Sequence, residues 1–197
     1  DISVSGTPAV TNVTTGNLTG TGGTDTVTLT GAQLDAIIIG TGTINLGAGA
    51  GDTINLTSTS ADLNTLGATN ASISGVEAIS AATAGAGVTI TLSGQTEAFT
   101  ITGGIGNDTI TGGTGADTIS AGAGNDTINL ANGQFAAGES IDGGTNTATG
   151  DSIILTNATT VDFTTGTVTN VETLTGGTGI DVVTLSATQW AGFSTIN

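Results

Sequence analysis

Three aspartates recur at nine-residue intervals in the middle of the chain, and they are the residues best placed to do chemistry. Asp108, Asp117 and Asp126 each occupy the sixth place of a nonapeptide, and the three nonapeptides run without interruption over residues 103–129. Their common form is G-G-x-G-x-D-x-U-x, in which U is a large aliphatic residue. A carboxylate that recurs on a fixed period can form a line of oxygen ligands along a repetitive fold, which suits a hard cation.

The chain contains no positive side chain that could pair with these carboxylates. Its 197 residues include 16 Asp and Glu but no Lys, Arg or His, so the formal net charge is −16. Each carboxylate must therefore be exposed, protonated or paired with an external cation. The same composition excludes nucleic acid as a partner, because nothing neutralises phosphates, and it excludes electrostatic binding to an anionic membrane. Catalysis by a His base, a Lys nucleophile or an Arg clamp is excluded too, and the absence of Cys removes thiolate metal sites.

Short strands must position the aspartates. In each x-U-x segment the aliphatic side chain points inward and the flanking Thr or Ser side chains point outward, while the glycines permit the turns between segments. This pattern predicts that Ile110, Ile119 and Ile128 stack as an aliphatic ladder. Equivalent core positions elsewhere are predicted at Val27, Ile54, Ile153 and Val183.

Degenerate copies extend the repeat over most of the chain. A fourth copy covers residues 176–184, looser copies cover 20–28 and 47–55, and a stretched copy covers 143–154. Residues 18–37 also match residues 174–193 at a constant offset. We therefore predict a single solenoid over residues 1–197, with regular repeats at 101–130 and degenerate repeats at 12–100 and 131–197. At the usual coil length it would have about nine to eleven coils. The longest apolar run, 36–39, is too short to insert into a membrane.

The tandem G-G-x-G-x-D-x-U-x nonapeptides resemble the RTX family of calcium-binding parallel β-rolls. The resemblance implies an all-β fold, a right-handed parallel β-solenoid (β-roll or β-helix) with tandem calcium turns. It also implies Ca²⁺ as the cofactor, bound between turns on the same side by Asp carboxylates and backbone carbonyls. Since two nonapeptides make about one coil, Asp108 and Asp126 should share an ion. Asp117 should lie on the opposite side and need the turn near 142–151 or a turn before Asp108.

Carried over to this chain, the resemblance assigns sixteen residues to metal sites. The carboxylates are Asp25, Asp52, Asp108, Asp117, Asp126, Asp142, Asp151 and Asp181; the carbonyl donors are Gly103, Ile105, Gly112, Thr114, Ala121 and Ala123; Asn107 and Asn125 help to orient the turns. Asp25, Asp52 and Asp181 belong to isolated copies, whose sites need neighbouring coils or another subunit to complete them.

The remaining acidic residues fit simpler roles. Glu77 and Glu172 precede an aliphatic strand and are either turn-stabilising acceptors or residues of a solvated face, and the solvated face is the favoured interpretation. A solvated position is also expected for Asp35, Asp62, Glu97, Glu139 and Asp162. Paired carboxylates can cleave glycosides, but no aromatic cluster is present to stack on a sugar, so we do not expect an enzyme. Regular Thr-x-Thr rows can bind ice, but here they do not recur at one coil interval.

These features together predict a structural protein. A solenoid without polar caps exposes sheet edges that can pair with another copy of the chain. We expect a secreted protein of the S-layer or extracellular-filament type, exported by type I secretion, whose folding and head-to-tail self-assembly require Ca²⁺. Its partners would be further copies of itself and a cell-surface glycan, with no nucleic acid. The alternatives are a repeat module of a large RTX adhesin and the C-terminal RTX part of a secreted hydrolase or toxin.

Overall fold

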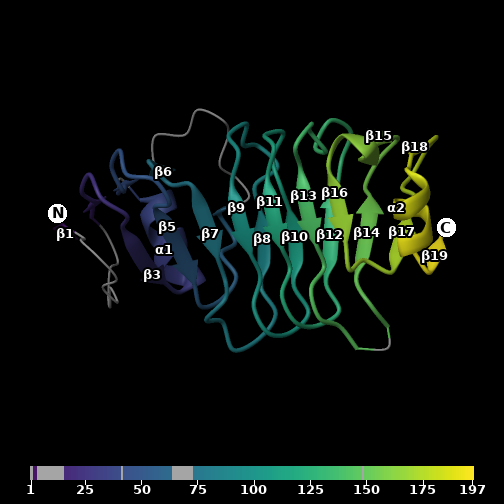
Figure 1. The fold of residues 1–197 in the computed structure, drawn as a ribbon. Helices are drawn as coiled ribbons and strands as arrows, with labels where there is room; N and C mark the ends of the chain where they lie inside the picture. Colours follow the sequence, from purple (N-terminus) through teal and green to yellow (C-terminus); the bar gives the residue numbers. More distant parts are fainter. Residues whose placement is uncertain (1, 4–15, 41, 64–72, 148) are drawn as a thin grey trace.

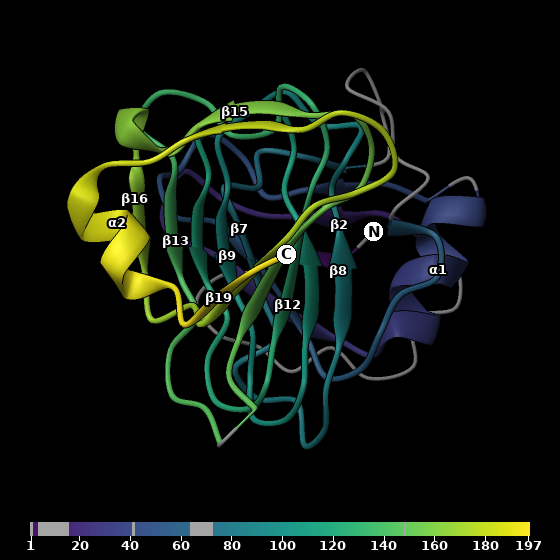
Figure 2. The same cartoon turned by 90° about the vertical axis from the view of Figure 1, so that its right-hand side faces the viewer.

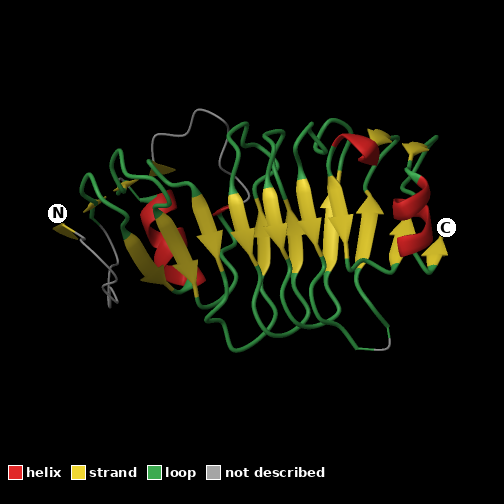
Figure 3. Cartoon of the chain, viewed as in Figure 1, coloured by secondary structure: helices red, strands yellow, loops and turns green. Residues whose placement is uncertain are grey.

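The chain winds into successive coils of a parallel β-solenoid. A computed structural model describes residues 2–3, 16–40, 42–63, 73–147 and 149–197, and the coils follow one another from the N-terminal to the C-terminal end (Figure 1). Strands and glycine-rich turns make up most of the described residues, and helices are few and short (Figure 3). No described helix is long and apolar enough to span a membrane.

Two large sheets contain most of the strands. The seven-stranded sheet has the spatial order β16 (Thr167–Thr169), β13 (Ser140–Asp142), β11 (Thr118–Ser120), β9 (Thr100–Thr102), β7 (Ala78–Ser80), β5 (Thr53–Leu56) and β3 (Thr26–Leu29). The six-stranded sheet has the order β19 (Thr195–Ile196), β17 (Thr173–Thr175), β14 (Ser152–Leu155), β12 (Thr127–Leu130), β10 (Thr109–Thr111) and β8 (Thr89–Thr91). The chain alternates between them from β8 to β14, and they form opposite walls of the solenoid (Figure 2).

Smaller sheets complete the two ends. A four-stranded sheet of β1 (Ile2–Ser3), β2 (Leu18–Thr19), β4 (Ile44–Asn45) and β6 (Ile73–Ser74) alternates along the chain with β3, β5 and β7. Near the C-terminal end β15 (Thr160–Asp162) pairs with β18 (Val182–Thr184). Every strand pair is parallel, and the expected all-β parallel β-roll is confirmed.

The predicted aliphatic positions form two ladders instead of one. In the six-stranded sheet Ile110 pairs with Ile128 and Ile128 pairs with Ile153, whereas Ile119 stands in the opposite wall between Ile101 and Ile141. These side chains are at most 1% exposed, and so are the predicted core residues Val27 and Ile54. Because consecutive nonapeptides lie in opposite walls, a residue stacks on the residue two repeats away. Val183 packs against the core only partly buried.

Coils outside the tandem repeats are longer than expected. The equivalent positions Asp108 and Asp126, in adjacent coils of the tandem repeats, are 18 residues apart, whereas the equivalent positions Asp25 and Asp52 are 27 residues apart. The predicted nine to eleven coils nevertheless agree with the strand count, because the four-stranded and six-stranded sheets that alternate with the seven-stranded sheet hold ten strands between them. The extra residues form turns and helices outside the strands, where they do not disturb the stacking of the aliphatic side chains.

Two helices interrupt the solenoid at matching places in the duplicated segments. Helix α1 (Gly31–Ile39) follows β3, and helix α2 (Ala187–Gly192) follows β18; a 3₁₀ helix, η2 (Phe163–Thr165), follows β15. Both α-helices begin with a capping box, Thr30 with Gln33 and Ser186 with Gln189. The duplication found in the sequence is therefore also a structural one, in which β17, β18, α2 and β19 repeat β2, β3, α1 and β4.

Candidate metal centre

Each tandem-repeat aspartate lies buried at the point where a turn becomes a strand. Asp108, Asp117 and Asp126 directly precede β10, β11 and β12, and they are 2%, 0% and 1% exposed. One carboxylate oxygen closes the turn: the Gly104 N–H donates to Asp108 Oδ2 at 2.7 Å, and the Gly113 N–H donates to Asp117 Oδ2 at 2.8 Å. The turn glycines thus hold the carboxylate beside the backbone that would supply carbonyl ligands.

The second carboxylate oxygen joins each coil to the preceding one. The Asp108 N–H donates to Asp126 Oδ1 at 2.7 Å, the Asp126 N–H to Asp151 Oδ1 at 2.6 Å, and the Asp151 N–H to Glu172 Oε2 at 2.7 Å. We call this line of four carboxylates, which runs beside the six-stranded sheet, column I. The predicted pairing of Asp108 with Asp126 on one side of the solenoid agrees with this geometry.

Column II consists of Asp117 and Glu139 and runs beside the seven-stranded sheet, where one of the two expected neighbours of Asp117, a turn before Asp108, is found. The Phe99 N–H donates to Asp117 Oδ1 at 2.8 Å, and the Asp117 N–H donates to Glu139 Oε2 at 3.0 Å. The turn that ends at Phe99, before Asp108, is thus one neighbour of Asp117, as one alternative expected. The other alternative was wrong: the acidic neighbour is Glu139 and not a residue of the turn at 142–151, because Asp151 precedes β14 in the opposite wall. Asp142 ends β13, and its Oδ1 accepts from the Gly144 N–H and the Asn170 side chain.

Two of the aspartates predicted in the degenerate repeats, Asp25 and Asp52, make the same coil-to-coil hydrogen bonds from backbone N–H to carboxylate. Asp25 precedes β3, Asp52 precedes β5 and Glu77 precedes β7, and these three residues form column III. The Asp25 N–H donates to Asp52 Oδ1 at 2.7 Å, and the Asp52 N–H donates to Glu77 Oε2 at 2.9 Å. Asp181 stands outside the columns, where it accepts from the Thr159 N–H at 2.9 Å and the Gly177 N–H at 3.0 Å.

Three glutamates take part that the sequence analysis placed on a solvated face. Glu139 is 1% exposed, so its expected solvated position was wrong, while Glu77 and Glu172 are half-buried and act as the turn-stabilising acceptors that were the less favoured alternative. Each occupies the acidic place of an E-x-U segment, which aligns with the D-x-U of the nonapeptides. That alignment is the signal that could have identified all three.

The carbonyls predicted as ligands lie in tightly stacked turns. A Cβ on Gly103 would lie 1.9 Å from the Ala121 carbonyl oxygen and 2.6 Å from Asp108 Oδ2, so only glycine fits between them. The turns are also held together by hydrogen bonds: Ala123 O accepts from the Gly106 N–H, and Gly112 O accepts from the Gln134 side chain. Of the other carbonyl donors, Ile105 forms a bridge with Ala123 in the turns of column I, while the Thr114 N–H donates to the Gln95 carbonyl in the turns of column II.

Asparagines connect the outer surface of the turns, as predicted. Asn107 Oδ1 accepts from the Asn125 N–H at 2.9 Å, and Asn125 Oδ1 accepts from the N–H and the hydroxyl of Thr147 at 3.2 and 2.8 Å. This exposed ladder fixes the stacking of three successive turns without adding charge.

Burial raises the pKa of several column carboxylates. For Asp126, burial and the repulsion of Asp151 and Asp108 outweigh the hydrogen bond from Asp108, and its pKa rises to about 6. For Glu139, burial and the nearby Asp117 raise the pKa to about 8. The pKa values of Asp117 and Asp151 are raised as well, chiefly by burial. The fold therefore disfavours the ionised columns unless a cation is present.

Four buried carboxylate oxygens in the described residues have no hydrogen-bond partner: Asp25 Oδ1, Asp52 Oδ2, Asp126 Oδ2 and Glu139 Oε1. Unpaired oxygens of this kind are costly to bury, and they are the donors that Ca²⁺ prefers. No group of three or more acidic side chains converges among the described residues, so a bound ion would also need the turn carbonyls. The columns therefore fit a hard divalent cation held by carboxylates and carbonyls together.

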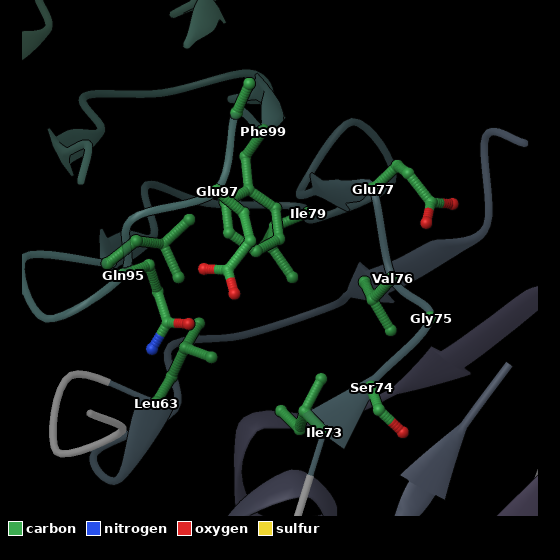
Figure 4. Close-up of a pocket in the computed structure, with 12 residues that line it drawn as sticks. Leu63, Ile73, Ser74, Gly75, Val76, Glu77, Ile79, Gln95, Glu97 and Phe99 are labelled. Atoms are coloured by element: carbon green, nitrogen blue, oxygen red, sulfur yellow. The ribbon is translucent and has the colours of Figure 1, made fainter. Parts of the chain in front are cut away.

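A separate pocket borders the end of column III. Its volume is about 270 Å³, and mainly apolar residues line it, among them Leu63, Ile73 and Phe99. Figure 4 shows the carboxylate of Glu97 within this lining, while the carboxylate of Glu77 lies at its margin. The last residue of column III thus borders a mainly apolar cavity.

Comparison with known proteins supports the interpretation of the columns. Residues 100–134 match the RTX calcium-binding nonapeptide repeat family, whose model spans four copies of the repeat. The chain carries RTX-type calcium-binding repeats. The match includes Asp108, Asp117 and Asp126, so calcium is the cation of these turns, and the predicted resemblance is confirmed. No curated protein and no solved structure matches the chain.

In these RTX repeats, carboxylates and backbone carbonyls of adjacent coils would hold calcium. Asp108 and Asp126 would offer carboxylate oxygens from adjacent coils, and the turn carbonyls of Gly103 and Ala121 lie beside them. Bound calcium supplies the positive charge that the side chains lack. The protein's part is to hold the turns in register, which the aliphatic ladders and the Asn107–Asn125 ladder do.

Proposed function

We propose that this protein is an extracellular structural subunit, of the S-layer or filament type, which folds around calcium and then assembles end to end with further copies. One observation carries the proposal: buried carboxylates form continuous columns in a chain that has no positive side chain. Such columns have no catalytic partner groups, but they couple the fold directly to external calcium. RTX repeats of this kind suit a secreted protein, because calcium is plentiful outside the cell.

Calcium would act as a folding switch. With a net charge of −16 and buried carboxylates, the calcium-free chain resists compaction by its own repulsion. Any ion that binds the folded state alone stabilises that state by mass action. Calcium would therefore favour the folded solenoid outside the cell and leave the chain open for export where calcium is scarce.

The last described coil exposes apolar side chains that are suited to packing against a further coil. In the N-terminal module, Leu34 and Ile37 of α1 are fully buried, because the next coil packs over the helix: Gly31 contacts Thr59, and Ser60 donates to Asp35. In α2 the equivalent of Leu34 is Trp190, which is 64% exposed. No coil packs over α2 among the described residues as residues 58–63 pack over α1.

The exposed strand edges of this coil support the same proposal. Strand β19 is the last strand of the six-stranded sheet, and strand β18 pairs on one side only within the described part of the chain. Ile180 and Val182, which lie beside and within β18, are 83% and 51% exposed. A free parallel edge flanked by apolar side chains is a surface on which another solenoid coil can dock. We propose that a second copy of the chain supplies this coil.

The test combines folding and assembly measurements on the whole chain. Circular dichroism, light scattering after size-exclusion chromatography and negative-stain microscopy would be recorded in millimolar Ca²⁺ and in EGTA. We expect β-structure and large assemblies in Ca²⁺, and neither in EGTA. Equal β-structure and equal assembly in both conditions would refute the calcium mechanism, and a calcium-folded protein that stays monomeric at all concentrations would refute self-assembly.

A matched pair of variants locates the assembly surface. Trp190→Ser removes an exposed apolar side chain from α2, and Ile39→Ser removes one that is 73% exposed on α1. Both changes are at the surface, so both proteins should fold in calcium. We expect Trp190→Ser to raise the concentration needed for assembly at least tenfold and Ile39→Ser to leave it unchanged. The opposite ranking would mean that the C-terminal end is not the contact surface.

A further inference from the structure

Column III lies far outside the residues that match the RTX family. Its carboxylates are spaced more widely along the chain than those of the tandem repeats: Asp25 and Asp52 are 27 residues apart, and Asp52 and Glu77 are 25 residues apart. The residues that match the family begin only at position 100. Asp25 and Asp52 are fully buried, and two of their oxygens, Asp25 Oδ1 and Asp52 Oδ2, have no hydrogen-bond partner. These are two of the four unpartnered buried side-chain oxygens among the described residues.

The hydrogen bonding and burial of the Asp52 carboxylate match those of the Asp126 carboxylate within the RTX repeats. In both residues Oδ1 accepts the backbone N–H of the aspartate one coil earlier, at 2.7 Å, and Oδ2 is buried without a partner. Both also stand between two other carboxylates of their column, since the Asp52 N–H donates to Glu77 and the Asp126 N–H donates to Asp151. The chain thus builds the same carboxylate environment twice, once without the regular nonapeptide.

The backbone around column III reproduces the RTX turns as well. A Cβ on Gly20 would lie 2.2 Å from the Leu46 carbonyl oxygen and 2.7 Å from Asp25 Oδ2. The corresponding distances for Gly103 in the RTX repeats are 1.9 Å to the Ala121 carbonyl oxygen and 2.6 Å to Asp108 Oδ2. The Leu46 carbonyl therefore stands beside its aspartate as the Ala121 carbonyl stands beside Asp108.

The glycines of successive turns stack in the same manner. Gly47 has φ +106° and lies against the Thr21 carbonyl, so that a Cβ on it would lie 2.0 Å from that oxygen. Gly122 has φ +110° and lies against the Gly104 carbonyl, where a Cβ would lie 2.4 Å from the oxygen. Both turns need glycine for its positive φ and for the close approach. Carbonyl oxygens are thereby brought next to the buried carboxylates in both places.

We propose that the turns at residues 20–25 and 46–52 form a second site for a hard divalent cation, which Asp25 Oδ1, Asp52 Oδ2 and the Leu46 carbonyl help to hold. The donor set is oxygen only and includes two carboxylates, which suits Ca²⁺. The inference rests on the proposed calcium dependence of the fold but not on self-assembly. It extends calcium binding from the matched repeats to the N-terminal coils.

The first test maps bound ions on the unaltered chain. Amide NMR signals would be recorded in Ca²⁺ while a small fraction of the calcium is replaced by Gd³⁺, a paramagnetic ion that binds oxygen donors. We expect selective broadening near residues 20–25 and 46–52 in addition to residues 103–126. Broadening confined to residues 103–126 would overturn the second site and leave the proposed function standing, whereas no broadening near 103–126 would refute calcium binding by the RTX turns.

Isothermal titration with Ca²⁺ separates the two sites by mutation. Asp52→Asn keeps an acceptor for the Asp25 N–H but removes the charge, and Asp126→Asn does the same in column I. The control is Asp162→Asn, which removes a charge from an exposed residue that caps η2.

Each variant has a defined outcome in this titration. We expect Asp52→Asn to lose one class of binding, with at least a tenfold fall in affinity, while the class removed by Asp126→Asn persists. Binding by Asp52→Asn that equals that of wild type and Asp162→Asn would overturn the proposal. If Asp52→Asn does not fold, the Gd³⁺ map of the wild-type chain decides the question.

Discussion

Replacing Glu139 with glutamine should make the calcium-free solenoid more stable, and increasingly so as the pH rises. Glutamine keeps an oxygen that can accept from the Asp117 N–H, but it removes a buried charge whose second oxygen has no partner. The folded-state pKa of Glu139 is raised from 4.5 to about 8. Between these values the folded state holds a proton that the unfolded chain releases, so wild-type stability falls as the pH increases.

The size of the effect follows from the shift in the pKa. Each unit is worth about 1.4 kcal/mol, so at pH 7 the wild type loses about 3 kcal/mol of unfolding free energy through Glu139, against about 1 kcal/mol at pH 5. Glutamine cannot ionise, so the unfolding free energy of Glu139→Gln does not decrease with pH through this position. The stability difference between Glu139→Gln and wild type should therefore grow by about 2 kcal/mol from pH 5 to pH 7, and further up to about pH 8.

Urea unfolding followed by circular dichroism would measure this difference in buffers stripped of divalent cations. A fixed concentration of a stabilising osmolyte, common to all samples, keeps the proteins folded before urea is added. Glu97→Gln is the control, because it removes the same charge from an exposed side chain. A stability difference that stays constant between pH 5 and pH 8 would refute the argument. In excess calcium the advantage of Glu139→Gln should shrink or reverse, since the ionised carboxylate then has a counter-charge.

Three further substitutions test the packing of the coils. Gly122→Ala places a Cβ 2.4 Å from the Gly104 carbonyl oxygen at φ +110°, so it should lower the thermal stability in calcium by more than about 1 kcal/mol, whereas Gly22→Ala, which meets no atom within 4 Å, should be tolerated. Ile119→Ala empties a side-chain position that is 1% exposed, and urea unfolding in calcium should show a loss of about 2–5 kcal/mol. Asn125→Ala removes the acceptor of the Thr147 N–H, so hydrogen exchange at Thr147 should become faster while overall stability falls by only about 1 kcal/mol.

The wall-forming strands could be predicted because their pattern is local. A D-x-U-x segment indicates where a strand starts, which residue points inward and which residues point outward. Ile110, Ile119 and Ile128 accordingly lie in the core. The length of each coil could not be predicted in the same way, since adjacent coils are 18 residues apart at Asp108 and Asp126 but 27 apart at Asp25 and Asp52. Coil length depends on how many residues form the turns between successive strands, and the sequence of a three-residue strand does not determine that number. Helix α1 did have a local signal in the sequence, the capping box of Thr30 and Gln33. The apolar run 36–39 that follows has no clear helical pattern of apolar and polar residues.

The site could be predicted only as far as the nonapeptide is regular. The resemblance placed Asp108 and Asp126 on one side correctly, because exactly two nonapeptides separate them and two nonapeptides complete one coil there. For Asp117 it offered two neighbours: the turn before Asp108 is correct, since the Phe99 N–H donates to Asp117. The turn near 142–151 is wrong, because the next coil of that wall is longer and has Glu139 at the acidic position. Which residue stacks on which is a property of the register between coils, and register is fixed by the pairing of β11 with β13 rather than by distance along the chain.

The columns end at glutamate for a reason visible in the backbone. At each aspartate that continues a column, the N–H points to the carboxylate of the following coil, as the Asp126 N–H does toward Asp151. At Glu77 and Glu172 the N–H turns back instead and donates to the carbonyl of the aspartate one coil earlier, at 3.0 Å in both cases. At Glu139 the N–H donates to Ala136 within its own turn.

A glutamate therefore leaves no N–H that the next coil must accept. The next coil is free to carry an uncharged residue at that place: Phe99 follows Glu77, Gly166 follows Glu139 and Ser194 follows Glu172. Aspartate continues a column, and glutamate, whose longer side chain still reaches back to the preceding coil, ends it. Since a chain without positive side chains gathers repulsion with every carboxylate added to a column, this backbone reversal limits how much charge the bound cations in each column must offset.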